Sequence, residues 1–585
     1  MPKSPVSLTP SRPPAAAKPS SKATARAKPP TVKSLRAGLG ALGQETRAAA
    51  ASTARGLAQL GRSTKASGGN LLGGVEKYFV PKAHVAKLVL ERVPDKTAAE
   101  TRALFDWPGD QAQLSTLVAS SDAQLAKLSD RALGQAVRPL LDPSLPGKLF
   151  GNATERSRQA LRLVLAHGTD AGHVDAVLGE IGYLRDAVKL LKGPAATELK
   201  ALLQANRARP GDWAGFERYL DSATNTEVRP GTKVEPLIDG QKAFPAMYKA
   251  IAEAKSSVNV SVFSFESDNT GWDMAKCLAS AADRGCKVRL VYDPVGSRET
   301  HGVATDANVF KFMTDHGVEV RAQGPGPLGD HLTHRKLTIV DGKTGFIGGM
   351  NVGDEYSKTW HDCHAKVTGL GVADLQALFV RQWKADGGSF SALDEARAFP
   401  PLTPDGAGGA RIIGHEGLLD QNLKLAYLRA IDTSQRTIHI ANPYFSDPDI
   451  ATHLEAAARR GVDVKVVVPA TNDQPLAQEA ELGYYQELLA AGVHLYQYTG
   501  RPMAHDKVAT FDGRLSTIGS SNLDARSLSN NDEANVWTSN PEVAEQLDRQ
   551  LFAVDVGHSR GVTTPEKNPA RALVHKLVRT LAPIL

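Results

Sequence analysis

The sequence contains few cysteines and no long apolar run. Only three cysteines occur among 585 residues, and a small odd number argues against a disulfide framework and fits a reducing compartment. No stretch of about 18 apolar residues occurs, so no membrane-spanning helix is predicted. The N-terminus lacks the apolar core of a secretory signal peptide. A cytoplasmic or peripheral-membrane location is therefore expected, with export by a signal-free route left open.

Acidic and aromatic residues are scarce at the N-terminus. Residues 1–75 hold twelve Lys or Arg and a single acid, Glu45, so this segment carries a net charge of +11 in a chain of +6. Such a stretch buries too little apolar surface to offset its ordering entropy, and it is predicted to be a basic low-complexity tail. The remaining residues carry −5, which is unlike the strongly basic body of a dedicated duplex binder.

The rest of the chain divides into regions of different periodicity. Residues 76–230 show apolar positions at spacings of three and four, broken by Gly and Pro, and predict a helical accessory domain without a catalytic constellation. From residue 234, short β-branched runs alternate with helical stretches, which is typical of an α/β fold. A Pro/Gly/Asp-rich stretch near 400–409 divides this part into predicted units at 234–400 and 408–585.

The two units repeat each other in order and character. Matching strand-like runs occur at 258–265, 287–292 and 316–320 in the first unit, and at 437–445, 464–468 and 491–495 in the second. Each unit is therefore predicted to contain a strand, a helix, a strand, a helix and a strand in this order, followed by a segment that carries a motif. The repeat predicts two pseudo-symmetric α/β units that share one active site.

A His-x-Lys-x4-Asp motif occurs once in each unit. Its defining residues are His334, Lys336 and Asp341 in the first unit and His505, Lys507 and Asp512 in the second. On a strand, alternate side chains share a face, so each His and Lys is expected to project into one cleft. There a Lys supplies charge to the nonbridging oxygens of a phosphate, and a His attacks phosphorus or moves a proton. The aspartates each precede Gly, as in a turn, and are interpreted as structural supports more than as proton-transfer groups.

The correspondence continues downstream of the motifs. Asn351 and Asn522 each lie 17 residues after the motif histidine of their unit, and Asp362 and Glu533 each lie 28 residues after it. Two copies that keep a His, a Lys, an amide and a carboxylate at equal offsets are hard to obtain by chance. A catalytic imidazole needs an acceptor on its other nitrogen, and the two carboxylates are the candidates for that role. Residues 360–364 offer metal-ligand side chains, but no second cluster has zinc-like spacing, so no metal is predicted.

The paired motifs resemble those of the phospholipase D superfamily, and the resemblance covers residues 234–585. The flanking segments 348–356 and 519–527 are most similar to bacterial cardiolipin synthases. The resemblance implies a two-step reaction in which His334 attacks phosphorus to form a phosphohistidine and His505 acts as general acid and base. The quasi-symmetry leaves the reverse assignment open.

The same resemblance implies roles for further residues. Lys336, Lys507, Asn351 and Asn522 would stabilise the charged five-coordinate phosphorus, and the covalent intermediate removes the need for a metal or other cofactor. The sequence departs from the family in one respect, because many cardiolipin synthases begin with membrane-spanning helices and this chain has a predicted helical domain instead. This departure leaves the acceptor open.

The leading function is phosphatidyl transfer or phospholipid hydrolysis, with cardiolipin synthase-like transfer first. One alternative is a metal-independent nuclease, against which the slightly acidic body argues. Another is a non-catalytic lipid-binding effector scaffold, against which the two intact motifs argue. The expected partners are a phospholipid substrate and a peripheral membrane surface, with nucleic acid second. An amphipathic basic helix at 570–585 suits a membrane surface, although packing against the catalytic body is favoured. The oligomeric state is left open.

Overall fold

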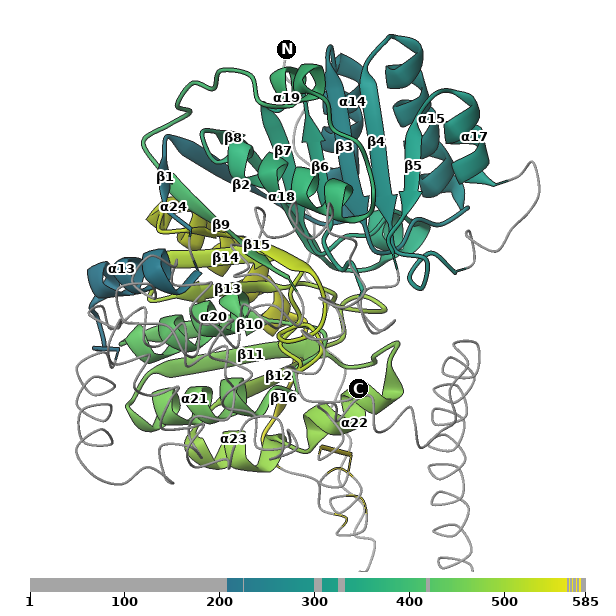
Figure 1. Ribbon diagram of the computed structural model, residues 1–585. Coiled ribbons are helices and arrows are strands. Elements are labelled where there is room, and N and C mark those ends of the chain that lie inside the picture. Colours follow the sequence, from purple (N-terminus) through teal and green to yellow (C-terminus); the bar gives the residue numbers. More distant parts are fainter. Residues whose placement is uncertain are drawn as a thin grey trace, which may run out of the picture. The chain divides into compact units, whose positions relative to one another are not determined.

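The computed structural model describes most of the chain from residue 208 onward. The described residues are 208–224, 226–298, 308–324, 332–416 and 421–564, together with 568, 571, 575, 578 and 579. All of them belong to one compact unit, Ser67–Leu585. The predicted basic tail, most of the predicted helical accessory domain and most of the predicted C-terminal helix lie outside the described residues. Figure 1 shows two β-sheets flanked by helices, so the predicted α/β class is confirmed.

The first sheet has seven strands in the order β2-β8-β7-β6-β3-β4-β5. Its strands are β2 (Thr232–Ile238), β3 (Ser257–Val262), β4 (Lys287–Tyr292), β5 (Glu319–Ala322), β6 (Leu337–Val340), β7 (Thr344–Gly348) and β8 (Cys363–Gly369). Strands β3, β4 and β5 run parallel, because helices connect them, and the remaining pairs are antiparallel. The strand-like runs of the first predicted unit thus form the parallel part of this sheet.

The second sheet has nine strands in the order β1-β9-β15-β14-β13-β10-β11-β12-β16. Its strands are β1 (Arg229–Pro230), β9 (Gly409–His415), β10 (Thr437–Ala441), β11 (Asp463–Pro469), β12 (His494–Tyr498), β13 (Val508–Phe511), β14 (Leu515–Gly519), β15 (Glu533–Thr538) and β16 (Ser559–Val562). The seven strands from β9 to β12 in this order match the seven of the first sheet one for one. The predicted internal repeat is therefore confirmed, with β1 and β16 added at the edges.

Helices connect and cover the strands. The first half contains α14 (Gly240–Glu253), α15 (Asn269–Asp283), α17 (Val309–Asp315), the π-helix η1 (Glu355–Thr359), α18 (Val372–Ala385) and α19 (Ala392–Ala398). The second half contains α20 (Asn422–Thr433), α21 (Pro448–Arg459), α22 (Pro475–Leu482), α23 (Tyr485–Ala491), α24 (Pro541–Leu547), the π-helix η2 (Asp548–Phe552) and α25 (Ala553–Gly557). A further helix, α13 (Trp213–Thr224), packs on α20. Equivalent helices begin at equivalent caps, because Asp268 before α15 and Asp447 before α21 each accept a backbone N–H of the first turn.

Three hydrophobic cores hold these layers. One lies between the first sheet and α14, α15 and α17, and another lies between the second sheet and α13, α20, α21 and α23. The third is shared by both halves: Leu337 and Val367 of the first sheet belong to it together with Ile518 and Val536 of the second. Helix α18 contacts β9, and α24 contacts β2. The two halves therefore meet through a continuous apolar layer, which fixes how the two motif segments face each other.

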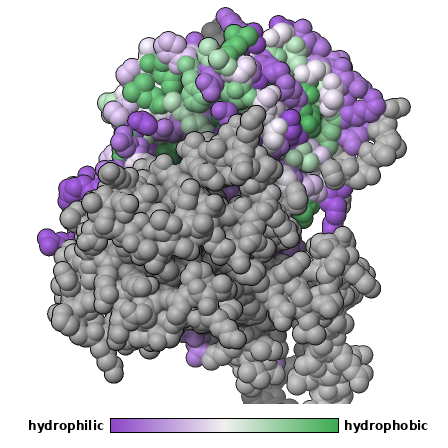
Figure 2. Space-filling model, in the orientation of Figure 1, coloured by the Kyte–Doolittle hydropathy of each residue, from purple (hydrophilic) through white to green (hydrophobic). Residues whose placement is uncertain are grey.

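One face of the first half can be followed in the space-filling view. Figure 2 shows hydrophobic and hydrophilic residues interspersed over the part of the first half that it presents. Among the helices of the described ranges, none combines the length and apolar character needed to cross a bilayer. Near the C-terminus, Val578 packs against Ala480 of α22, and His575 Nε2 lies 3.0 Å from Glu479 Oε2. These contacts place the described residues of that segment against the second half.

Candidate active site

The two motif histidines lie just before equivalent strands. Strands β6 and β13 each begin one residue after the motif lysine, so the structure differs from the expectation that His and Lys lie on the strand itself. The reason is that these residues pair with the opposite half. His334 N donates to Asp532 O at 2.8 Å, and His505 N donates to His361 O at 2.6 Å. Each motif segment is thus fixed by backbone hydrogen bonds across the junction of the halves.

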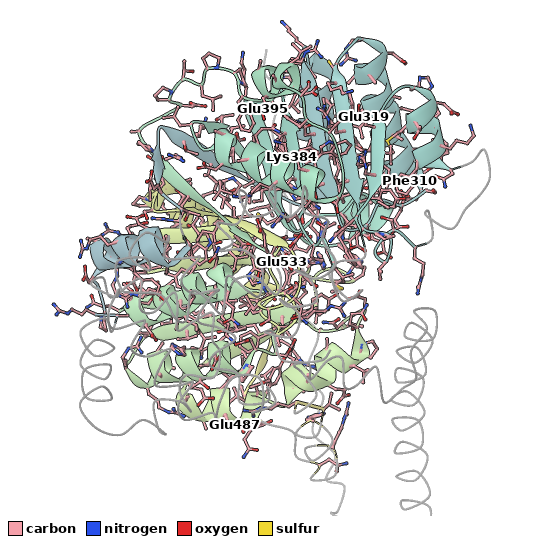
Figure 3. All side chains as sticks on the ribbon, in the orientation of Figure 1. Phe310, Glu319, Lys384, Glu395, Glu487 and Glu533 are labelled. Carbon is pink, nitrogen blue, oxygen red and sulfur yellow. The ribbon has the colours of Figure 1, made fainter. Side chains whose placement is uncertain are left out.

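Each motif histidine is also held by a carboxylate from the other half. His334 Nδ1 lies 2.9 Å from Glu533 Oε1, and His505 Nδ1 lies 2.7 Å from Asp362 Oδ2. Both carboxylates are fully buried, and Figure 3 shows Glu533 where the two halves meet. Because an ionised carboxylate can only accept, the contact with Glu533 places the proton of His334 on Nδ1 and leaves Nε2 as base or nucleophile. Burial raises the pKa of Asp362 well above its usual range, although the charge of Lys507 opposes the change.

Two serines that the motif analysis did not assign support Glu533. Ser520 Oγ donates to Glu533 Oε2, and Ser527 Oγ donates to Glu533 Oε1 at 2.7 Å. In the first half the residue matching Ser520 is Gly349, where an added Cβ would lie 2.2 Å from Asp362 Oδ1. The sequence signal for Ser520 was its place in the matched segment 519–527, but its partner could not be read from the sequence.

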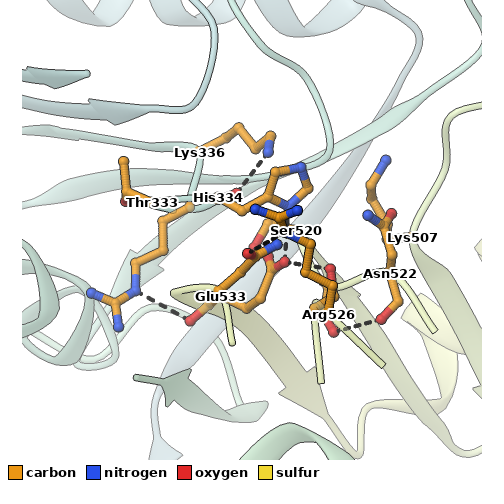
Figure 4. Close-up of polar contacts among 12 residues, drawn as sticks. Thr333, His334, Lys336, Lys507, Ser520, Asn522, Arg526 and Glu533 are labelled. Atoms are coloured by element: carbon orange, nitrogen blue, oxygen red, sulfur yellow. Dashed lines mark hydrogen bonds and ion pairs between the residues drawn. The ribbon is translucent and has the colours of Figure 1, made fainter. Parts of the chain in front are cut away.

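The two motif lysines lie beside the rings. Lys336 Nζ donates to His334 O at 2.6 Å, and Lys507 Nζ lies 2.9 Å from His505 Nε2. Figure 4 shows the His334 ring with Lys336 on one side and Lys507 on the other. Burial, together with the charges of Lys336 and Lys507, lowers the pKa of His334 to about 4, although Glu533 opposes the change. Burial, then Lys507, Lys336 and His334, lower the pKa of His505. The titratable groups of the two motifs therefore lie within electrostatic reach of one another.

Burial disfavours the charged forms of the two motif lysines. It lowers the pKa of Lys336 well below the usual range, and it lowers the pKa of Lys507 to about 8 although Asp362 and Asp506 oppose the change. A bound phosphodiester anion would favour the charged forms of both lysines. The two imidazoles and the two amines are therefore buried basic groups whose charged forms a bound anion would favour.

The two matched amides have different surroundings. Asn351 Oδ1 accepts from Ser264 N at 3.1 Å, and Asn351 Nδ2 donates to Tyr356 Oη at 2.8 Å. Asn522 is buried, and its Oδ1 has no hydrogen-bond partner among the described residues. Figure 4 shows Asn522 beside Lys507. An unpaired buried amide is costly, so Asn522 is the better placed of the two to contact a substrate.

The two motif aspartates lie at the far ends of β6 and β13. Asp341 accepts hydrogen bonds from the backbone N–H groups of 255–257, and Asp512 accepts them from those of 435–437. Both aspartates have positive φ, +53° and +56°. Each therefore ties the turn after its motif strand to the start of the neighbouring strand. A catalytic role would require these side chains to reach the histidines, from which four strand residues separate them.

Aromatic rings border both histidines. Ring centroids of Tyr356 and Trp360 lie 5.3 Å from that of His505, and that of Tyr444 lies 6.4 Å away. Phe263 lies 5.1 Å from His334. These rings exclude water from the imidazoles, a role that motif spacing did not predict. Among the described residues, metal-ligating side chains gather at His361, Asp506 and Asp555, the first two of which are chain neighbours of Asp362 and His505.

Comparison with known proteins identifies the family of the chain. The family model "Cardiolipin synthase, PLD-like domain" matches residues 247–383 and 427–554. A Bacillus subtilis protein named probable cardiolipin synthase is 32% identical over 346 residues, which cover 57% of this chain and 68% of that protein. A Listeria monocytogenes cardiolipin synthase is 31% identical over 371 residues, covering 60% and 75%. The crystal structure of Haemophilus influenzae phosphatidylserine synthase superposes with a TM-score of 0.48 at 14% identity, covering 60% of this chain and 95% of that one. The chain belongs to the phospholipase D superfamily, in which it is similar to the bacterial cardiolipin synthases.

Proposed function

We propose that the protein transfers a phosphatidyl group from a phospholipid to an alcohol, with cardiolipin formation from phosphatidylglycerol as the first candidate reaction. The observation that carries the proposal is the crossed pairing of His334 with Glu533 and of His505 with Asp362. This pairing orients two imidazoles toward one pocket that favours an anion. The relatives named cardiolipin synthases support a phospholipid as that anion.

The proposed reaction has two steps. In the first, His334 Nε2 attacks phosphorus, the bond from phosphorus to the leaving oxygen breaks, and His505 Nε2 donates a proton to that oxygen. In the second, His505 takes the proton of the acceptor hydroxyl, whose oxygen bonds to phosphorus as the phosphorus–nitrogen bond breaks. Glu533 and Asp362 stabilise the positive charge that each ring carries in turn.

The remaining site residues act on the phosphate charge. Lys336 and Lys507 would neutralise the nonbridging oxygens, and Nδ2 of Asn522 would donate a hydrogen bond to one of them. The unpaired Oδ1 of Asn522 could accept only from a hydroxyl of the substrate. The substrate's negative charge also favours the protonated form of His505, which burial disfavours in its absence. Substrate binding would in this way prepare the general acid for the first step.

The proposal is tested by product analysis. The purified full-length chain is incubated in detergent micelles with phosphatidylglycerol or with phosphatidylcholine plus glycerol, and the lipids are analysed by mass spectrometry. We expect cardiolipin from phosphatidylglycerol, and none from a His334→Asn variant purified in the same way. Phosphatidic acid as the only product would show that the protein hydrolyses phospholipids and does not transfer the phosphatidyl group. If neither cardiolipin nor phosphatidic acid formed from either lipid, the proposal would be overturned.

A further inference from the structure

A second group of polar side chains is buried behind the catalytic pair His505–Asp362. His361, Asp506 and Asp555, here called the His361 cluster, offer ligand atoms that all lie within 4.8 Å of one another. The three residues are far apart in the sequence: His361 precedes β8, Asp506 lies between the second motif's His and Lys, and Asp555 lies in α25. Their side chains are 6%, 1% and 1% exposed. The cluster therefore joins both halves and the C-terminal helices at one buried point.

A carboxylate that does not belong to the cluster orients the imidazole of His361. His361 Nδ1 lies 2.7 Å from Asp239 Oδ1, and Asp239 is in turn paired with Arg501 at 2.9 Å. Because this carboxylate holds the Nδ1 proton, it directs Nε2 toward the two cluster aspartates. A carboxylate that fixes the tautomer of a histidine in this way is the usual second partner of a metal-bound imidazole.

The cluster's inward-facing atoms have no hydrogen bonds. His361 Nε2 and all four carboxylate oxygens of Asp506 and Asp555 are buried without a hydrogen-bond partner in the described part of the chain. Nε2 is 2.9 Å from Asp555 Oδ1 and 3.7 Å from Asp506 Oδ2. Two buried carboxylates without hydrogen bonds destabilise the fold unless a cation offsets their charge.

A proton offers one way to offset this charge. Although burial disfavours it, Asp506, Asp239 and Asp555 raise the pKa of His361 to about 12 when no other cation is present. A protonated ring places one positive charge beside Asp555 Oδ1, but it leaves both oxygens of Asp506 and the second oxygen of Asp555 without hydrogen bonds. A divalent ion would supply two charges and contact both carboxylates at once.

We propose that His361 Nε2, Asp506 and Asp555 bind one divalent transition-metal ion, with Zn²⁺ first and Mn²⁺ second. Ligand atoms bound at about 2.0–2.2 Å to one ion lie roughly 3–3.5 Å apart, and the observed separations of 2.9 and 3.7 Å bracket this range. One nitrogen and two carboxylate ligands suit these ions better than Mg²⁺ or Ca²⁺, which take oxygen ligands alone. Three protein ligands leave a fourth position for a water molecule, but the burial of all three side chains separates the site from substrate, so the ion would be structural.

The position of the site indicates what the ion would do. His361 O accepts from His505 N at 2.6 Å, and Asp506 and Asp362 are chain neighbours of His505 and His361. An ion here would link α25 to the segments that carry His505 and its carboxylate. It would therefore act as a positioning element for the general acid and base, and it would take no part in the chemical steps.

Metal analysis of the full-length chain tests this proposal without any lipid substrate. The protein is stripped with chelator, dialysed against Zn²⁺ or Mn²⁺ at micromolar concentration, and analysed by plasma mass spectrometry. We expect about one ion per wild-type chain, a loss of at least about 100-fold in affinity for Asp555→Asn, and a loss of about 10–100-fold for Asp239→Asn. Asp432→Asn is the matched control, because Asp432 holds His453 in an equivalent His–Asp pair, at 2.8 Å, outside the cluster. It should bind metal as the wild type does.

A second measurement guards against variants that fail to fold. X-ray absorption of the metal-loaded wild type should show nitrogen and oxygen neighbours only, with the outer-shell scattering of a single imidazole. Wild-type protein that binds no ion, or that binds one with no imidazole, would overturn the proposal and leave a protonated His361 in the cluster. Equal binding by wild type and a folded Asp555→Asn variant would overturn it as well. Neither result depends on whether the protein transfers phosphatidyl groups.

Discussion

Glu533 and Asp362 each reach across the junction of the halves to an imidazole. Glu533→Gln keeps the side-chain shape but lets an amide NH₂ face His334 Nδ1, which favours the wrong tautomer and removes the charge that stabilises the imidazolium. We expect kcat to fall by about 10²–10⁴-fold with a much smaller change in KM. Steady-state kinetics on the lipid substrate measure both.

Glu481→Gln is the matched control for that prediction. Glu481 is also a fully buried glutamate of the second half, but it bonds Tyr485 Oη in the helical layer and not a motif histidine. Its replacement should leave kcat unchanged at neutral pH. Equal losses of kcat in the two variants would show that Glu533 acts only through the fold.

Glu481 carries a second prediction, which concerns stability. Burial raises its pKa to about 8, against a hydrogen bond with Tyr485, while in the unfolded chain it titrates near about 4.3. Between these values the folded state keeps a proton that the unfolded state has lost. The contribution of Glu481 to the free energy of unfolding therefore falls as pH rises through this window, by at most about 1.4 kcal/mol per pH unit.

Urea unfolding of wild type and Glu481→Gln at several pH values checks this window. The stability of the variant relative to the wild type should rise between about pH 5 and about pH 8 and then level off. A difference that does not change with pH would mean that Glu481 ionises normally in the folded protein.

The sequence identified the candidate residues but not how they pair. Asp362 and Glu533 stand at the same offset from their own motif, so the sequence alone fits pairing within each half as well as pairing between halves. The structure pairs them between halves. Asp506 and Asp555 gave no signal at all, because a metal ligand set assembled from three distant segments has no characteristic spacing.

At the scale of elements, the turn after each motif strand is fastened by an aspartate. Asp341→Ala removes the acceptor of the backbone N–H groups of 255–257 at the start of β3. We expect the free energy of unfolding to fall by about 2–4 kcal/mol, because a charged acceptor of several hydrogen bonds is lost. The folded fraction should keep kcat within several-fold, because the turn lies at the opposite end of β6 from His334.

Chemical denaturation and kinetics on the same preparation separate the two effects. Lys343→Ala, in the same turn, serves as the control, because Lys343 contributes only its backbone to the turn, through a hydrogen bond from N to Val340 O. A loss of kcat by orders of magnitude in folded Asp341→Ala protein would contradict a supporting role.

The elements themselves were largely predictable. The β-branched runs at 258–265, 287–292 and 464–468 overlap β3, β4 and β11, because alternating or continuous apolar residues of this kind fit buried strands. Strand β16 and the π-helices η1 and η2 were not predicted. β16, with the sequence SRGV, lacks an apolar pattern and forms by pairing with β12, so tertiary contact decides its conformation.

At the scale of the whole molecule, one apolar layer joins the two halves. Residues of both sheets, α18 and α24 contribute to it, so neither half buries this face alone. We expect the halves to unfold in a single cooperative transition. Hydrogen exchange at increasing denaturant should give peptides from β6–β8 and from β13–β15 one common free energy of opening. Two separate free energies would show that each half is stable without the other.

The proposed reaction requires that a motif histidine forms a bond to phosphorus in a site built by both halves. Rapid mixing of the full-length chain with phosphatidylglycerol, an alkaline quench that preserves phosphohistidine, and peptide mass spectrometry test this directly. We predict a transient phosphatidyl adduct on the wild-type peptide that contains His334 and no adduct on the corresponding peptide of His334→Asn. Product formation without an adduct on His334 or His505 at any time would contradict it.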